Sequence, residues 1–472
     1  MTRNIVIFLL VSLSINSFAV PIDWKGTLAF DSNILNDVRR TSDNCTAAAG
    51  SQCINPLEDN ARFQSMILKL NPNIIVNDGV TIRGELTTGG VRGVNLGDST
   101  SVDSNGDIYS YYAQTTSSTL NVNQLYAEVF ADTAQFRIGR FARHFGLGAL
   151  VNGGNQTWDR FFSGYEGVET NLKLGNFKLS PMWAKLHTGD ANRTPAEADP
   201  NGSYDSYEVS VEALYDDPNR NLKVGVYYAV REIERRDRLY NAGSQNTTLI
   251  DVFFKKEWEK VSLGLEVPML SGEVGDLYNT GDTNADFDTN GYVFEGAYRL
   301  SDNWVFNLHA GLIKGDDGSS ANTFEGMYLH PNYKFSEVIY KYNYAAFMDG
   351  DRDIFNASVT NSTYAALTAV YKGVEWSWKM GLVWAKANQV AKSGDDFYDH
   401  DARQVVTAAA DQSDDMGYEA NVSFDYQWNP SVVFTGYVGY HFVGDFYSFT
   451  NTSEELETSD VMNTGMRFSV NF

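Results

Sequence analysis

Cysteine, proline, basic side chains and long apolar runs are all scarce in this sequence. Its 472 residues include 2 Cys and 10 Pro, and 36 Lys and Arg stand against 60 Asp and Glu, a net charge of −24. This deficit argues against a nucleic-acid partner, because phosphate binding needs Lys and Arg gathered on one face. A mean hydropathy of −0.32, with one short continuous apolar segment, excludes a helical membrane bundle.

Glycine and aromatic residues are abundant instead. The chain contains 40 Gly, 27 Tyr, 28 Phe and 9 Trp. This composition favours many strands and turns, with more aromatic surface than the core of a soluble domain uses. It therefore predicts an all-β protein whose surroundings differ from those of an ordinary soluble protein.

The apolar segment lies at the N-terminus and predicts export. Arg3 precedes the run from Ile5 to Val11, and small residues lead to a cleavage site after Ala19. The run is about half of the roughly 20 residues that a membrane-spanning helix needs. Residues 1–19 are therefore predicted to be a cleaved signal peptide.

The two cysteines are predicted to form a disulfide in a surface loop. Cys45 and Cys53 lie eight positions apart in a polar stretch, and an exported chain meets oxidising conditions. A two-thiolate metal site is the alternative, but no His or second Cys pair lies nearby.

From Val20 to the end, polarity alternates with a period of two. Val374, Trp376, Trp378, Met380, Leu382 and Trp384 share one face, for example, and Glu375, Ser377 and Lys379 share the other. A helix cannot produce this alternation, so it predicts strands with one apolar and one polar face.

Short and long connections alternate between these strands. Nine compact turns are Asn77–Gly79, Asp132–Thr133, Gly175–Asn176, Asp216–Asn219, Glu259–Lys260, Ser301–Asn303, Phe335–Glu337, Lys372–Gly373 and Asn429–Pro430, and ten long stretches rich in Asp, Asn, Ser, Thr and Gly separate them. Soluble β-sandwiches and propellers lack this asymmetry. The pattern predicts one domain over residues 20–472, a transmembrane antiparallel up-and-down β-barrel of about 18–20 strands with short periplasmic turns and long acidic extracellular loops.

Aromatic residues near strand ends support this fold. Expected girdle positions are Trp24, Trp183, Tyr227, Tyr228, Trp258, Trp304, Tyr340, Tyr342, Tyr344, Trp428 and Tyr437. The final strand alternates up to the last residue, with Met462, Thr464, Met466, Phe468, Val470 and Phe472 on one face. A terminal Phe472 with this alternation resembles the assembly signal of Gram-negative outer-membrane barrels.

Two segments resemble a known family. The first runs from Leu125 to Leu186 and includes Phe136-Arg137-Ile138-Gly139-Arg140 and Phe145-Gly146-Leu147-Gly148; the second runs from Tyr426 to Asp445. Together they resemble the alginate-export family of outer-membrane porins, and more broadly the porin superfamily. That resemblance implies a monomeric barrel of about eighteen strands and an anionic polysaccharide as solute.

The charges expected on the polar faces are balanced. We count ten basic and eleven acidic lumenal side chains, whereas a pore for an anionic polymer needs a basic lining. The residues predicted to line the pore or set its selectivity are Arg83, Glu85, Arg137, Arg140, Arg143, Glu169, Lys173, Lys223, Arg231, Arg299, Glu375 and Lys379. Strict alternation places Arg140 on the lipid-facing side, so its lumenal position depends on a β-bulge at Gly139.

No catalytic motif or cofactor site is predicted. The six histidines lie in separate segments and form no recognisable pair or triad. Three acidic loop segments, Asp282–Asp288, Asp349–Asp353 and Asp395–Asp401, suggest weak Ca²⁺ binding at most, because they lack the Gly and Glu of a helix-loop-helix site.

The sequence therefore predicts an integral protein of the cell outer membrane, not an enzyme. We expect a porin for passive diffusion of small hydrophilic solutes or ions, in contact with outer-membrane lipid, lipopolysaccharide and the barrel-assembly machinery. The alternatives are a dedicated channel for an anionic saccharide and a non-conducting barrel that displays adhesive loops.

Overall fold

The structure is a computed structural model of the chain. It describes residues 22–38, 60–88, 94–95, 120–187, 206–235, 243–275, 285–320, 322–342, 355, 357–399, 404–451 and 455–472. The predicted signal peptide, Cys45 and Cys53 lie outside these residues, as does the predicted girdle residue Tyr344.

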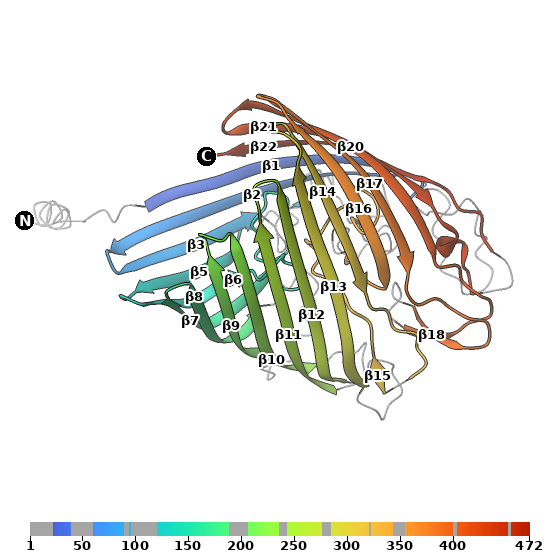
Figure 1. The fold of residues 1–472 in the computed structure, drawn as a ribbon, viewed down its shortest axis with the longest axis horizontal. Helices are drawn as coiled ribbons and strands as arrows, with labels where there is room; N and C mark the ends of the chain where they lie inside the picture. The colour runs from blue at the N-terminus through green and yellow to red at the C-terminus, as the bar shows by residue number, and fades with distance from the viewer. Residues whose placement is uncertain are drawn as a thin grey trace, which may run out of the picture.

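Eighteen of the described strands form one closed antiparallel barrel (Figure 1). They are β1 (Ile22–Asn36), β2 (Asn60–Asn77), β3 (Val80–Thr88), β5 (Leu120–Phe130), β6 (Ala134–Arg143), β7 (Ser163–Leu174), β8 (Phe177–His187), β9 (Ser206–Asp217), β10 (Leu222–Arg235), β11 (Gly243–Glu257), β12 (Val261–Gly275), β13 (Ala285–Arg299), β14 (Trp304–Ile313), β16 (Ser362–Lys372), β17 (Trp376–Ala387), β20 (Asp415–Asn429), β21 (Val432–Val443) and β22 (Val461–Asn471). Each pairs with its neighbours in sequence, and β1 also pairs with β22.

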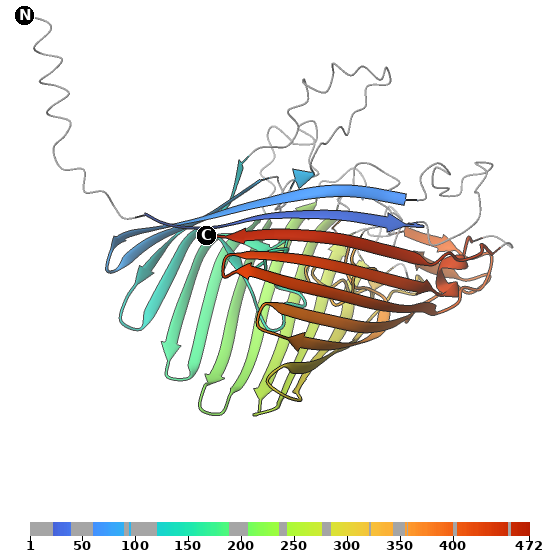
Figure 2. The same cartoon turned by 90° about the horizontal axis from the view of Figure 1, so that it is seen from above.

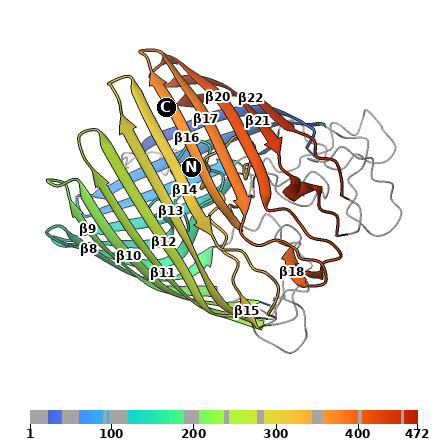
Figure 3. The same cartoon turned by 45° about the vertical axis from the view of Figure 1, so that its right-hand side comes forward.

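Smaller elements lie beside the barrel strands. The two-residue strands β4 (Val94–Asn95) and β15 (Thr323–Phe324) pair with β2 and β13. A separate hairpin, β18 (Asp396–Asp399) and β19 (Gln404–Thr407), and a short 3-10 helix, η3 (Asp445–Ser448), belong to long connections (Figure 3). Among the described residues, no helix is both long and apolar enough to cross a membrane.

Eight tight turns join strands at one end of the barrel, which we call the short-turn rim; the long connections lie at the other end, the loop rim (Figure 2). The turn residues have the side-chain hydrogen bonds and backbone conformations that tight turns require. Asn77 accepts a hydrogen bond from the Gly79 backbone (2.8 Å), and Gly175 adopts a φ of +63°. The predicted asymmetry of the connections is confirmed.

The alternation predicted from the sequence is present in the barrel wall. On β17, Trp376, Leu382 and Trp384 are exposed on the outer face, whereas Val383 and Ala385 are buried on the lumenal face. Because paired residues of an antiparallel ladder share a face, register extends this assignment around the barrel. The outer surface is an apolar band, and the lumenal surface carries the charges.

One predicted hairpin is wrong, and it explains the difference between twenty strands and eighteen. Phe335–Glu337 is not a turn of the wall but part of the long connection from β14 to β16. Tyr340 and Tyr342, expected in a girdle, belong to this same connection. Tyr227 and Tyr437 were also expected in the girdle, but both are buried on the lumenal side.

Candidate pore constriction

Two connections from the loop rim fold into the lumen. We call residues 144–162, between β6 and β7, inner segment A, and the described residues among 314–361, between β14 and β16, inner segment B. Each has apolar side chains that are almost wholly buried, such as Val151 in segment A and Leu329 in segment B. Since both contact the lumenal face of the wall, they fill part of the barrel interior.

Inner segment A begins by docking on β10 to β12. The ring of Phe145 packs between those of Tyr227 and Phe253, with centroids 5.6 and 6.1 Å away. The Glu266 carboxylate then accepts hydrogen bonds from the backbone N–H groups of Leu147 and Ala149, the latter at 3.0 Å. A charged acceptor from the wall thus satisfies loop amides that would otherwise be buried without partners.

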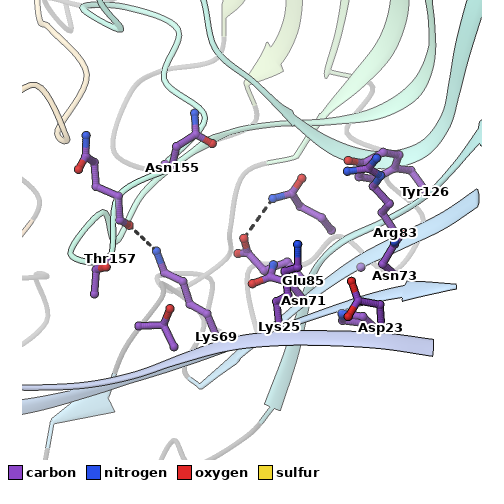
Figure 4. A pocket seen from close by; sticks show the side chains of 16 residues that line it. Asp23, Lys25, Lys69, Asn71, Asn73, Arg83, Glu85, Tyr126, Asn155 and Thr157 are labelled. Atoms are coloured by element: carbon purple, nitrogen blue, oxygen red, sulfur yellow. Dashed lines mark hydrogen bonds between the residues drawn. The ribbon is translucent and has the colours of Figure 1, made fainter. Parts of the chain in front are cut away.

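The far end of inner segment A reaches β2 and β22. Lys69 (Figure 4) donates to the backbone carbonyl of Gln156 at 2.7 Å. It also donates to the backbone carbonyl of Asp159 at 3.4 Å. Arg160 donates to the Ser65 hydroxyl at 2.5 Å. Inner segment A therefore contacts β12 and β2, strands that are far apart in the order of the barrel wall.

Inner segment B is held by a second wall carboxylate. Glu419, on β20, accepts from three consecutive backbone N–H groups, those of Glu337, Val338 and Ile339, at 2.7 to 3.0 Å. Lys334 ties the segment to itself by donating to the carbonyls of Tyr340 and Ala357, at 2.7 and 2.6 Å. Burial, together with the nearby Lys341 ammonium, lowers the pKa of Lys334 to about 7.

The two inner segments contact each other. The His330 backbone N–H donates to the Ala149 carbonyl at 2.7 Å. Phe161 and Asn332 exchange two hydrogen bonds, at 3.2 and 2.6 Å. An apolar cluster that includes Ala149 and Leu329 packs behind these contacts. The two connections together form a constriction rather than two separate loops.

A network of ion pairs covers the lumenal face of β6 to β10. Arg137 and Arg143 both bind Glu169, at 2.5 and 2.9 Å, and Arg143 also reaches Glu212 at 3.3 Å. Next along the wall, Arg231 pairs with Glu208 at 2.6 Å. Charge is therefore neutralised locally along this wall.

The other predicted lumenal residues are spread over the wall. Arg83 pairs with Glu128 at 2.6 Å, and Glu85 accepts from the side chains of Asn123 and Gln124. Lys223 pairs with Asp216 at 3.0 Å. By register, Lys173, Arg299 and Lys379 also lie on the lumenal face, the first two near the short-turn rim.

Two predicted pore residues lie elsewhere. Arg140 is on the outer face, where it binds Glu166 at 2.6 Å, because the register of β5 with β6 runs through Gly139 without the expected bulge and pairs Arg140 with the exposed Leu125. Glu375 was predicted to lie on the polar face of a strand. It lies instead in the short turn between β16 and β17, one residue before β17 begins.

A polar cavity of about 400 Å³ remains in the lumen beside inner segment A (Figure 4). Strands β1, β2, β3 and β5 form one side of it, and residues 154–157 of inner segment A form the other. Ten of the sixteen lining residues have a charged or amide side chain. The lining consists of Asp23, Lys25, Thr27, Lys69, Asn71, Pro72, Asn73, Arg83, Gly84, Glu85, Gln124, Tyr126, Gly154, Asn155, Gln156 and Thr157. Three cations and two carboxylates give the lining nearly balanced charge.

The anchors of the constriction were not singled out from the sequence. Glu266 and Glu419 were expected only as two of eleven lumenal acids, and Lys69 was not predicted at all. A signal existed in the glycines of inner segment A. Gly146 has a φ of +60°, and a Cβ there would overlap the Glu266 carboxylate, so only glycine permits this approach.

Among the residues that the structure describes, no group of three or more His, Cys, Asp or Glu side chains could hold a metal ion. The acidic segment Asp349–Asp353 lies outside the described residues, as do parts of Asp282–Asp288 and Asp395–Asp401.

Known structures share this architecture, although no family model and no curated sequence matches the chain. The outer membrane protein opdK from Pseudomonas aeruginosa is 11% identical, with a TM-score of 0.51 over 95% of this chain and 98% of that one. A BenF-like porin from Pseudomonas fluorescens is 10% identical, with a TM-score of 0.52 over 96% and 98%. OprD from Pseudomonas aeruginosa is 11% identical, with a TM-score of 0.50 over 95% and 94%.

These likenesses do not single out the alginate-export family, which the sequence had suggested. At such low identity they establish architecture alone. The chain has the fold of an outer-membrane porin, a closed antiparallel transmembrane β-barrel.

Proposed function

We propose that the chain is an integral outer-membrane channel through which small hydrophilic solutes diffuse passively. The observation that carries this proposal is the polar cavity that remains beside the constriction, inside a closed barrel with an apolar outer band. A barrel with these two surfaces is stable in lipid and offers water-soluble molecules a polar path.

The lining favours solutes that are neutral or carry both signs of charge. Lys25, Lys69 and Arg83 lie on the same side of the cavity as Asp23 and Glu85, and amide-bearing residues such as Asn71 and Asn73 are interspersed among them. Balanced charge creates no strong barrier for either ion sign, while amides and hydroxyls replace the hydrogen bonds of a partly dehydrated solute. Lumenal charges and the two inner segments would set selectivity by size and sign.

A dedicated channel for an anionic saccharide, as in the alginate-export family, is the finer alternative. The paired charges on β6 to β10 disfavour it, since Arg137, Arg143 and Arg231 each bind a carboxylate and leave little net positive charge for a polyanion. A non-conducting barrel that displays adhesive loops is the third reading, and a lumen closed to solutes would favour it. No catalytic role is proposed.

The proposed location implies its partners. The apolar band would contact membrane lipid, and the Arg140–Glu166 pair on the outer face would lie near the headgroups of lipopolysaccharide. The barrel-assembly machinery would bind β22 together with Phe472, the residue that follows it.

Single-channel current of the refolded chain in a planar bilayer, with a salt gradient, tests the proposal. We expect stable conductance steps with weak ion selectivity, and swelling of proteoliposomes in monosaccharides and amino acids but not in oligouronates. A chain that is demonstrably folded yet gives no steps would contradict a channel. Selective entry of oligouronates would favour the alginate-type channel.

A matched pair of variants ties the current to the cavity. Lys25→Gln removes one positive charge from the lining, and Arg140→Gln removes one from the outer face. We expect the reversal potential to move toward cation preference only for Lys25→Gln. Equal effects from both variants would mean that the current does not pass this cavity.

A further inference from the structure

Asp251 and Glu266 form a buried carboxyl pair in the wall. They lie on the lumenal face of adjacent strands, β11 and β12, and the register pairs Phe253 with Glu266, which makes Asp251 a diagonal neighbour. Both residues are 0% exposed, and their carboxyl groups lie close enough to interact with each other. No basic side chain forms an ion pair with either of them among the described residues.

Geometry indicates where a proton must lie. Glu266 uses its two oxygens to accept from the backbones of Leu147 and Ala149. Neither oxygen of Asp251 receives a hydrogen bond from any donor that the structure describes. Two carboxylates in contact within a dry site cannot both be ionised. Because Glu266 is the acceptor, Asp251 is the member that carries the proton and donates it to Glu266.

The docking of inner segment A is built on this pair. Gly146 adopts a left-handed conformation that brings its backbone against the Glu266 carboxylate, where a Cβ would overlap it. The Leu147 side chain covers Gly264, two residues before Glu266. The start of inner segment A therefore rests on Glu266 through close contacts and two hydrogen bonds.

We propose that Asp251 and Glu266 act as a proton-dependent latch, which holds inner segment A in the lumen while they share one proton and releases it when that proton is lost. Loss of the proton leaves two adjacent charges without a compensating cation, and separation of the pair relieves their repulsion. As Glu266 moves, Leu147 and Ala149 lose their acceptor. The predicted change in conductance depends on the proposed channel function, whereas the shared proton does not depend on it.

Other titratable groups face the pair from the surrounding elements. They are Tyr227 on β10, Lys255 on β11, Glu295 on β13 with its partner His309 on β14, Tyr364 on β16, Tyr333 in inner segment B, His144 at the start of inner segment A and the more distant Arg143 at the end of β6. Because several titratable groups surround the pair, a pH-dependent transition is best tested by changing the pair itself.

Conductance of the full chain in a planar bilayer, measured from about pH 7 to about pH 10, tests the latch. Wild type is expected to pass from a low to a higher conductance as the pH rises. Asp251→Asn, whose amide donates to Glu266 and cannot lose a proton in this range, should lose that rise. Glu266→Gln, which cannot accept both backbone N–H groups, should conduct at the higher level throughout. Asp425→Asn, a lumenal change away from inner segment A, is the control and should titrate like wild type.

An infrared measurement separates this proposal from the proposed function. The folded wild type at neutral pH should show the carbonyl band of a protonated, buried carboxyl group, and Asp251→Asn should lose it. Absence of this band in folded wild type overturns the latch whether or not the chain conducts. So does an alkaline rise that Asp251→Asn retains. If no variant conducts but the band behaves as expected, the shared proton stands and the channel function fails.

Discussion

The ring of Phe472, the last residue, lies over Gly26 on the outer face of the first barrel strand. The two residues exchange both of their main-chain hydrogen bonds, at 2.8 and 3.0 Å. A Cβ at position 26 would overlap the Phe472 ring. The first and last strands are therefore joined at the short-turn rim by a contact that requires glycine on one side and permits a large ring on the other.

Replacing Gly26 by Val should weaken barrel closure. The branched side chain would displace the Phe472 ring, and overpacking of this kind costs about 1–3 kcal/mol. We expect a smaller folded fraction in membranes, measured by heat-dependent migration on gels. Gly79→Ala is the matched control, because a Cβ there meets its neighbours at ordinary distances of 3.6 Å or more. Equal losses from both variants would show that the contact with Phe472 has no special role.

Removing Arg143 should change both stability and selectivity. Its guanidinium is almost wholly buried between Glu169 and Glu212, and breaking a buried ion pair from one side costs about 3–5 kcal/mol. Arg143→Ala is therefore expected to unfold at lower denaturant concentration and to shift the reversal potential toward cations. Arg143→Lys should keep more of the selectivity than of the stability.

Arg140 supplies the comparison on the same strand. Its pair with Glu166 lies on the outer face and is partly exposed, and such pairs are worth about 0–1 kcal/mol. Arg140→Ala should leave the reversal potential unchanged and the unfolding midpoint nearly so. A selectivity change in this variant comparable to that of Arg143→Ala would mean that Arg140 lines the pore after all.

Glu419 should control the position of inner segment B. Glu419→Ala leaves the N–H groups of Glu337, Val338 and Ile339 without their acceptor, and each buried unsatisfied group costs about 1–3 kcal/mol. We expect undocking of the segment and a larger, noisier single-channel conductance. Glu419→Gln keeps one acceptor oxygen and should give an intermediate result. Wild-type currents from Glu419→Ala would contradict an anchoring role.

The barrel wall was predictable because its solvent imposes a simple rule on every strand. Lipid outside and polar groups inside force a period of two, so Trp376 and Trp384 could be assigned to one face from the sequence. Tight turns such as Asn77–Gly79 were predictable because few residue types fit them. The last strand, β22, follows the same alternation.

The constriction was not predictable, because inner segments A and B pack inside the barrel. They contact neither lipid nor bulk water along a regular face, so their sequences carry no simple period. In inner segment B, the apolar run Val338-Ile339-Tyr340 resembles a wall strand by composition, although its contacts are with Glu419 and the lumenal face. For Arg140, strict alternation along β6 was right and the expected bulge at Gly139 was wrong; only the register of β6 with its neighbours shows that no bulge is present.

Acid should loosen inner segment B through Lys334. Its pKa in the docked segment is about 7, below the ordinary 10.5, because burial disfavours the ammonium. Between about pH 7 and pH 10.5, Lys334 is neutral in the docked segment but protonated in the undocked one. The docked state therefore becomes more stable as the pH rises from about 7 to about 10.5. Below about pH 7, the cost of burying the ammonium in the docked state is at its maximum. We expect current fluctuations in wild type to increase as the pH falls from about 10.5 to about 7 and to level off below about 7. Lys334→Met cannot titrate, so its fluctuations should not change across this range, although loss of the two hydrogen bonds to Tyr340 and Ala357 should raise them at every pH. An acid-dependent increase that persists in Lys334→Met would assign the effect to another group.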